Sequence, residues 1–186
     1  MSQSSLLKSK RFLPFFVTQF LGAFNDNIFK NTLMLLIAYS AVNKMGGDIN
    51  VILNLAAGLF ILPFFLFSGI AGQITDCHEK SRLMRRIKLL EIIIMAFAAL
   101  AFYFEQYFAL LLLLFMMGVQ STFFGPAKYA ILPQHLKTEE LVGGNAIVEM
   151  GTFVAILLGT IGAGLIMQFE ARVEIVSFAI VILSVL

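Results

Sequence analysis

The chain has 186 residues, of which 60% are hydrophobic and 13% are charged. Soluble domains carry about 25% charged residues, so this composition excludes an ordinary soluble domain and predicts an integral membrane protein. The formal net charge of +2 is too small to indicate a nucleic-acid partner. The single cysteine, Cys77, excludes a disulfide within the chain and offers no thiolate cluster for a metal. We therefore expect an all-α membrane protein without a metal or a cofactor.

Apolar runs along the chain predict six membrane-spanning helices, since a helix needs about 20 apolar residues to cross the hydrocarbon core. The first run is too long for the core of a signal peptide, so we expect it to be retained as the first span. The last run is still apolar at Leu186 and shorter than a full span. This predicts that the sequence is the N-terminal piece of a longer protein. The expected spans are residues 12–42, 51–74, 87–104, 107–132, 141–168 and, incompletely, 172–186.

Proline, turn and glycine signals refine these spans. Pro63 lies inside the second span and predicts a kink, because its ring displaces a backbone hydrogen bond. The minimal turn at 105–106 predicts a tight hairpin between spans three and four. Residues 133–140 are expected to form the next loop, with Thr138 as the N-cap of the helix that follows. The fifth span carries a seam of small residues that suits close helix packing: Gly151, Gly159, Gly162 and Gly164.

Basic residues gather on one side of this topology. Segment 76–88 is the most charged stretch and is expected to be a loop plus the start, at about Ile87, of the third span, in which Glu91 can pair with Lys88. Lys44 and Arg172 would lie on the opposite side. Because cytoplasmic loops carry the excess of Lys and Arg, we expect the N-terminus in the cytoplasm. The basic residues on that side are Lys8, Lys10, Arg11, Lys80, Arg82, Arg85, Arg86, Lys88 and Lys137.

A carboxylate in the first span is the main candidate for function. Asp26 would lie roughly 20 Å along its helix, close to the bilayer midplane, where an unpaired charge is costly. Lys30 follows at i+4 on the same helical face, in the favourable acid-first order. Asn25, Asn27 and Asn31 add further polarity around the acid. The pattern predicts a polar site for a solute or, as the simpler alternative, an internal Asp–Lys pair that only fixes helix packing.

Segment 72–82, GQITDCHEKSR, resembles the signature loop between spans two and three of the major facilitator superfamily. That loop reads Gly-x-x-x-Asp followed by basic residues. The resemblance implies that Asp76 docks on a helix terminus of the opposite half of a carrier and locks one conformation. Cys77 and Glu79 depart from the pattern, which has a base and a glycine at these positions. The alternative is an ordinary positive-inside loop. The matching residues are Gly72, Asp76, Lys80 and Arg82, of which the last three are the implied gating residues.

Other stretches resemble the bacterial lysophospholipid transporter family, a branch of the same superfamily. They are QFLGAFNDN at 19–27, FGPAKYAIL at 124–132, NAIVE at 145–149 and AILLG at 155–159. The chain would then be the first six-helix half of a twelve-helix carrier in the bacterial inner membrane, with the second half as its partner. The sequence departs from the family at Asn25, where glycine is usual, and at Glu91, where a small residue is usual.

The resemblance implies transport of lysophospholipid from the outer to the inner leaflet for reacylation. Some family members are fused to acyltransferase and acyl-carrier-protein ligase domains, which are therefore possible partners. From the residues, a zwitterionic phosphoethanolamine head group is expected to follow a polar track, with lysines attracting its phosphate and carboxylates its amine. The Lys128–Glu149 pair can also be read as a simple ion pair or as a gate. The candidate substrate-binding residues are Asn25, Asp26, Asn27, Lys30, Lys128, Asn145 and Glu149.

Other functions fit the sequence less well. Residues 135–140 have an acid five positions after His135, loosely like an acyltransferase box, but its companion motifs are missing, so we expect no catalytic residue. A phosphate loop of the Gly-x-x-x-x-Gly-Lys type is also missing, which argues against a primary pump driven by ATP. Two alternatives stay open. One is a carrier for another amphiphile or drug driven by proton exchange through Asp26 or Glu149, and the other is a membrane anchor for a downstream lipid-modifying enzyme.

Overall fold

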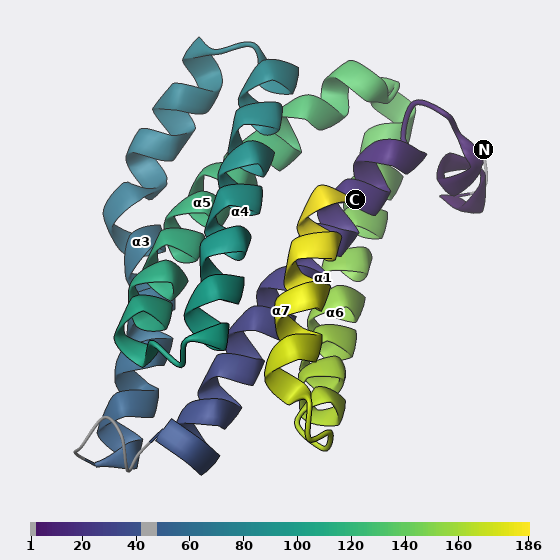
Figure 1. Ribbon diagram of the computed structural model, residues 1–186. Helices are drawn as coiled ribbons and strands as arrows, with labels where there is room; N and C mark the ends of the chain where they lie inside the picture. The colour runs from purple at the N-terminus through teal and green to yellow at the C-terminus, as the bar shows by residue number, and fades with distance from the viewer. Residues whose placement is uncertain (1–2, 42–47) are drawn as a thin grey trace.

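The computed structural model describes residues 3–41 and 48–186, and all the regular structure in these ranges is helical. This confirms the expected all-α class. Figure 1 shows long helices running roughly along one common direction. A 3-10 turn, Gln3–Lys8, precedes the first helix, and a π-helical turn, Ile37–Ala41, extends it. The α-helices are α1 (Leu13–Leu36), α3 (Ile49–Cys77), α4 (Lys80–Tyr103), α5 (Tyr107–His135), α6 (Leu141–Ile166) and α7 (Arg172–Val185).

With the π-helical turn counted as part of the first helix, helix bounds agree with the expected spans to within three residues, with one exception. Helix α4 starts at Lys80, whereas the third span is expected from residue 87. By length and composition, three helical segments suit a membrane crossing within the described residues: Ile49–Cys77, Tyr107–His135 and Thr138–Ile166. The division of the whole chain into six spans stays a prediction. Lys44, which is expected on the side opposite to most basic residues, lies outside the described residues.

The charged start of α4 is helical because two side chains cap the turn before it. Glu79 is the N-cap, and its carboxylate accepts hydrogen bonds from the backbone N–H of Ser81 at 2.9 Å and of Arg82 at 2.7 Å. Lys80 Nζ donates to the carbonyl of Thr75 at 2.6 Å and so caps the end of α3. The expectation that 80–86 forms a loop is therefore wrong, since these caps satisfy the backbone groups that a helix end leaves free.

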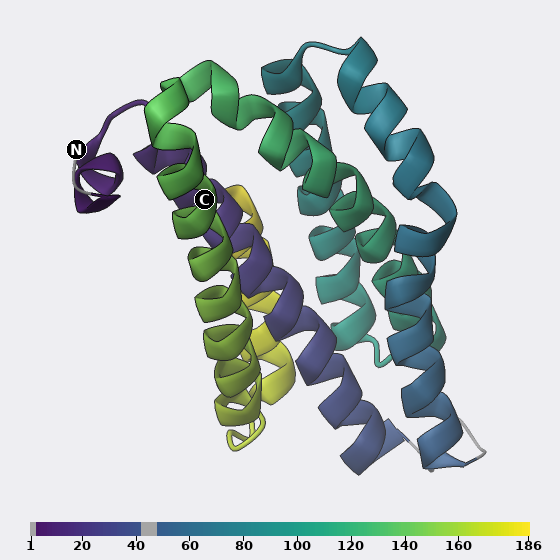
Figure 2. The same cartoon turned by 180° about the vertical axis from the view of Figure 1, so that it is seen from behind.

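Helix α3 bends about midway along its length (Figure 2), in keeping with Pro63 inside it. The bend is packed closely against α5 at Gly118. A Cβ atom at Gly118 would lie 2.5 Å from the carbonyl oxygen of Phe60 and 3.0 Å from Cγ of Pro63. Only glycine allows the backbones of α3 and α5 to approach this closely, because any side chain would collide with main-chain atoms.

The bundle is held together by pairwise packing between its helices, most of which are not neighbours in the sequence. Helix α1 packs on α6 and α7, α3 packs on α5, and α4 packs on α5 and α7. Gly159 of α6 sits against α1, since a Cβ there would lie 2.7 Å from the carbonyl oxygen of Phe24. Gly151 is similarly close to the ring of Phe16, but a Cβ at Gly164 would have no neighbour within 4 Å. The expected seam of small residues therefore allows close helix contact at Gly151 and Gly159 but not at Gly164.

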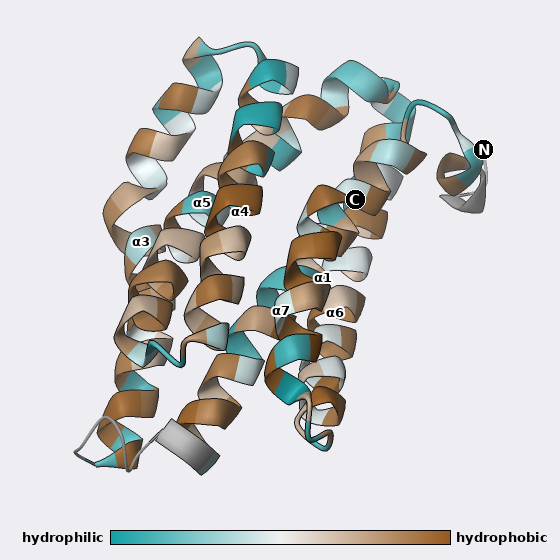
Figure 3. Ribbon diagram, viewed as in Figure 1, coloured by the Kyte–Doolittle hydropathy of each residue, from teal (hydrophilic) through white to brown (hydrophobic). Residues whose placement is uncertain are grey.

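The connections at one end of the bundle carry most of the charge. The start of α1, the α3–α4 turn and the α5–α6 connection lie at this end, and Figure 3 shows hydrophilic residues gathered there. Arg11 binds Glu140 with Nη2–Oε2 at 2.7 Å, which ties the start of α1 to the start of α6. Glu140 also accepts the backbone N–H of Lys137 at 2.9 Å. The sequence predicts Thr138 as the N-cap of α6, but Thr138 opens a 3-10 turn that precedes this helix.

One further expectation near this end needs correction. Helix α5 continues through Pro133 to His135, so the expected loop at 133–140 starts three residues later. Because α4 starts at Lys80, Lys88 lies two turns inside the helix and not at its start, with a side chain that is 15% exposed. Arg82, Arg85, Arg86 and Lys137 are exposed at this end of the bundle.

Candidate functional site

A polar cavity of about 190 Å³ lies between α1, α4, α5 and α6. Phe64 of α3 and Phe124 of α5 contribute aromatic walls, while Gly22 and Gly125 leave room for the space. Of the substrate-binding residues expected from sequence, Asp26 and Lys128 line this cavity. The other polar residues that line it are Gln19, Glu91, Gln120, Ser121 and Thr152.

Asp26 reaches the cavity, and no cation of the described residues forms an ion pair with it. Ser121 Oγ donates a hydrogen bond to its Oδ2 at 2.9 Å, and its Oδ1 is buried without a hydrogen-bond partner. Lys30 does not pair with it; its Nζ lies over the ring of Phe60, 5.0 Å from the ring centroid, as a cation–π contact. The internal Asp26–Lys30 pair considered from sequence is thus not formed. A buried carboxylate oxygen with no donor is unfavourable, so this position favours a ligand or a proton.

Glu91 is the second carboxylate at the cavity, and its charge is compensated. Lys88 Nζ lies 2.9 Å from each of its oxygens, and Gln120 Nε2 donates to Oε2 at 3.1 Å. The pairing with Lys88 expected from sequence is therefore confirmed. Its place at the cavity was not expected, although an acid inside an apolar run is a sequence signal for such a place. Gln120 and Ser121 were also missed as site residues; their signal is the polar interruption of the Leu-rich run in α5.

Lys128 belongs to a second polar cluster, on the α6 side of the cavity. Its Nζ lies 3.3 Å from Glu149 Oε1 and 4.8 Å from the ring centroid of Tyr129. The Tyr129 hydroxyl also donates to Glu149 Oε1. Thr152 Oγ1 lies 3.5 Å from Lys128 Nζ and 3.1 Å from Gln19 Oε1, so the cluster connects α5 to α1 through α6. The Lys128–Glu149 pair is present, but Glu149 is not among the residues that line the cavity.

The asparagines expected in the site serve the backbone or lie elsewhere. Asn25 is fully buried and donates to the carbonyl of Ile180 in α7 at 3.1 Å. Asn27 donates to the carbonyl of Ala23 in its own helix at 2.8 Å. Asn145 is partly buried one turn before Glu149 and does not line the cavity. Asn25 also hydrogen-bonds Glu91, which lines the cavity, and the substrate-binding role expected of the three asparagines stays a prediction.

The residues of the expected gate lie at the charged end, away from the cavity. Asp76 is exposed in the last turn of α3, and Arg82 is exposed in the first turn of α4. Lys80 is engaged with the carbonyls that end α3. The pKa of the Glu79 carboxyl lies below its usual value because the backbone N–H groups of Arg82 and Ser81 donate to it. The gating role itself stays a prediction.

The described part of the chain holds no group of side chains suited to bind a metal ion. No group of three or more His, Cys, Asp or Glu side chains gathers there in a way that could hold a metal ion. His78 makes a local contact instead, with Nδ1 lying 2.9 Å from the carbonyl oxygen of Ile74.

Known proteins resemble this chain over nearly its whole length. It is 28% identical to the lysophospholipid transporter LplT of Citrobacter koseri over 172 residues, which are 92% of the chain and 40% of that protein. Identity to LplT of Escherichia fergusonii is 29% over 174 residues, or 94% of the chain and 41% of the relative. LplT of Enterobacter sp. is 29% identical over 164 residues, or 88% and 38%. The chain thus spans about two fifths of the length of these curated relatives.

No solved structure gives a significant match to the chain. The family model of the Major Facilitator Superfamily matches residues 15–186, which include every α-helix from the first turn of α1 onward. The all-helical bundle, with polar side chains directed into a cavity between its helices, agrees with that match. The chain belongs to the Major Facilitator Superfamily.

Proposed function

We propose that this chain is the N-terminal half of a secondary carrier that moves lysophospholipids across the bacterial cytoplasmic membrane. The observation that carries the proposal is the carboxylate of Asp26, which reaches a polar cavity with one buried oxygen unpartnered. A solute that supplies a hydrogen-bond donor with positive charge would complete this site. The similarity to proteins named lysophospholipid transporter LplT supports a lipid with one acyl chain as that solute.

The charges around the cavity suit a zwitterionic head group such as that of lysophosphatidylethanolamine. The ammonium group would bind Asp26 Oδ1, and the phosphate would face Lys128 across the cavity. Lys128 Nζ lies 3.3 Å from Glu149 Oε1. When a phosphate enters the cavity, this ammonium group would turn from Glu149 toward it. Asn25, Asn27, Lys30 and Asn145 would act around this site through helix packing and not by contact with the head group.

The direction of transport follows from the orientation of the bundle. With the charged end in the cytoplasm, a head group taken up from the outer leaflet would pass Asp26 before it reached the Lys128 cluster. Flipping of the lipid would require a second helical half, against which this half rocks. Asp76, Lys80 and Arg82 would then face that half and control closure. An acyltransferase or acyl-carrier-protein ligase is the expected partner for reacylation of the delivered lysolipid.

Uptake of labelled lysophosphatidylethanolamine into proteoliposomes that contain the full-length protein tests this function. We expect Asp26→Asn to lower the initial rate by about tenfold or more, the equivalent of one lost charge-assisted contact. Lys128→Gln should weaken uptake of lysolipids that carry a phosphate. Glu170→Gln is the matched control, because Glu170 is an exposed acid in the α6–α7 turn. Unchanged uptake by Asp26→Asn would remove this residue from the mechanism.

A carrier that exchanges protons for another amphiphile is the second candidate. The absence of a cation beside Asp26 among the described residues favours it, because a proton would also neutralise the carboxylate. The two candidates differ in cargo and in driving force. A proton gradient that accelerates the export of an amphiphilic dye, with no uptake of lysolipid, would support the second candidate over the first.

A further inference from the structure

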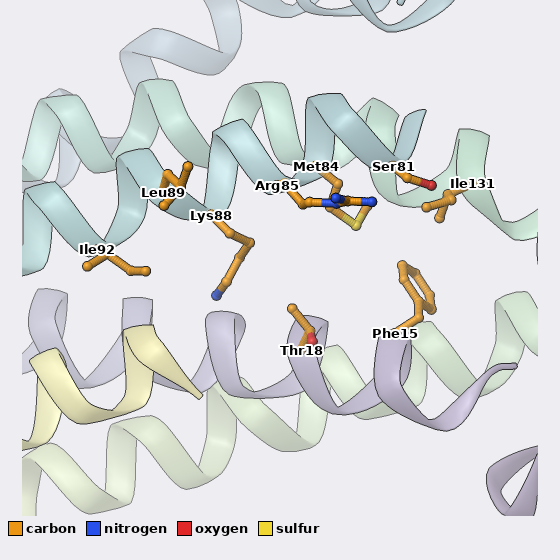
Figure 4. A pocket seen from close by; sticks show the side chains of 9 residues that line it. All are labelled: Phe15, Thr18, Ser81, Met84, Arg85, Lys88, Leu89, Ile92 and Ile131. Atoms are coloured by element: carbon orange, nitrogen blue, oxygen red, sulfur yellow. The ribbon is translucent and has the colours of Figure 1, made fainter. Parts of the chain in front are cut away.

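A second cavity, of about 440 Å³, lies between α1 and α4, beside the polar cavity that Asp26 lines. Figure 4 shows it as a groove with α4 along one wall and α1 along the other. Its volume is more than twice that of the polar cavity. The apolar residues that line it are Phe15, Met84, Leu89, Ile92 and Ile131. The polar ones are Thr18, Ser81, Arg85 and Lys88, which face the groove from its two walls.

One ion pair connects the groove to the polar cavity. Lys88 lines the groove, Glu91 lines the cavity, and Lys88 Nζ lies 2.9 Å from both carboxylate oxygens of Glu91. Gly22 of α1 lies against this pair. A Cβ at Gly22 would be 3.5 Å from Lys88 Nζ and 3.7 Å from Glu91 Oε2. The partition between the two spaces is therefore built from two long, rotatable side chains and a residue without a side chain.

We propose that the lysophospholipid binds across this partition, with its head group in the polar cavity and its single acyl chain in the α1–α4 groove. The inference rests on the proposed function and specifies where the chain of that substrate lies. The groove matches an acyl chain chemically, because apolar surface lines most of it and burial of each methylene is favourable. A lipid with two acyl chains would leave one chain without a place in the groove, which favours the lyso form.

The ion pair would open when the substrate binds. Separating Lys88 from Glu91 without compensation would strand two buried charges. As the head group passes Gly22 on its way to Asp26 and Lys128, its phosphate would take over Lys88, while Gln120 would keep its 3.1 Å hydrogen bond to Glu91. The exchange of one anionic partner of Lys88 for another makes the partition a substrate-dependent gate. Gly22 provides the gap through which the glycerol backbone would pass.

A photoreactive lysophosphatidylethanolamine, with a diazirine near the end of its acyl chain, tests the location directly. In proteoliposomes of the full-length protein, we expect crosslinks at Leu89 and Ile92, competed by unlabelled lysolipid and reduced by Asp26→Asn. Crosslinks confined to Phe64 and Phe124 would place the acyl chain in the polar cavity and overturn the inference. Absence of labelling at 89 and 92, as expected if another protein segment fills the groove, would overturn it as well.

Substitutions that fill the groove give a second readout. Leu89→Trp with Ile92→Trp should lower the rate of uptake of a palmitoyl lysolipid by about tenfold, because the chain loses its apolar site. Uptake of a hexanoyl analogue should change less than twofold. Leu90→Trp is the matched control, since Leu90 is exposed on the same helix but does not line the groove. Leu89→Ala with Ile92→Ala, which removes bulk from the groove, should keep uptake, and retained hexanoyl uptake by the Trp variant shows that it is folded.

The outcomes separate this inference from the proposed function. If the unmodified protein takes up no lysolipid of any chain length, the proposed function fails. If it takes up lysolipid but neither Trp substitution nor chain length alters the rate, the function stands and the groove does not hold the chain.

Discussion

At the scale of single residues, the site is defined by how its charges are paired. Lys88 neutralises Glu91, and Lys128 is held by Glu149. Lys30 is turned toward the ring of Phe60. These assignments leave Asp26 as the carboxylate that a solute or a proton must satisfy. The pairing of cations with acids follows from helix packing. The three lysines come from α1, α4 and α5, and the packing of these helices decides which acid each lysine reaches.

Gly22 offers a graded test of the space beside the ion pair. Gly22→Ala should be tolerated, because its Cβ would make contacts of 3.5 to 3.8 Å, which are ordinary van der Waals distances. Gly22→Leu should push into Lys88 and Glu91 and lower lysolipid uptake by about tenfold while the protein stays folded. Initial uptake rates, with thermal unfolding of each variant as the control, measure the effect. Equal loss of activity in both variants would show that the space beside Gly22 is not what matters.

At the scale of helices, the turn between α3 and α4 shows which features local sequence determines. The apolar runs predict the ends of five helices closely, because hydrophobic length is what defines a span. They misplace the start of α4, because a charged segment predicts a loop. Here Glu79 and Lys80 cap the two helix ends, so the charged residues are helical. Capping by a Glu at this place is not evident from composition. It depends on whether the side chain folds back onto Ser81 and Arg82.

Acid should weaken the cap at α4. Since hydrogen bonding holds the pKa of Glu79 below its usual 4.5, the cap contributes fully above the unfolded value and is lost as pH falls through the lower, folded value. We expect the amides of Ser81 and Arg82 to exchange faster in Glu79→Ala than in the unmodified protein at neutral pH. After correction for intrinsic rates, this difference should disappear once the pH has fallen below the lowered pKa of the Glu79 carboxyl. Glu139→Ala is the control, and identical protection in all three proteins at neutral pH would contradict the cap.

At the scale of the whole molecule, sequence alone predicts the helix order and class but only part of the site. Asp26 and Lys128 share the cavity as the sequence suggests, although they are far apart in the chain. Asn25 and Asn27 were expected beside them and instead donate to backbone carbonyls. A buried amide takes whichever acceptor the packing brings near, and that neighbour is a property of the assembled bundle. The α1–α4 groove is beyond sequence reasoning for the same reason.

The orientation of the bundle in the membrane can be measured through Cys77, the one cysteine among these 186 residues. Cys77 is exposed at the end of α3, on the charged end that the positive-inside rule places in the cytoplasm. A membrane-impermeant maleimide should therefore label Cys77 in inverted membrane vesicles and leave it unlabelled in intact spheroplasts. A variant with Cys77→Ser and Glu170→Cys moves the thiol to the exposed α6–α7 turn at the opposite end and should give the reverse pattern. Labelling of Cys77 in spheroplasts would invert the topology, so that Lys128 would meet the head group before Asp26 and the proposed direction of transport would have to be reversed.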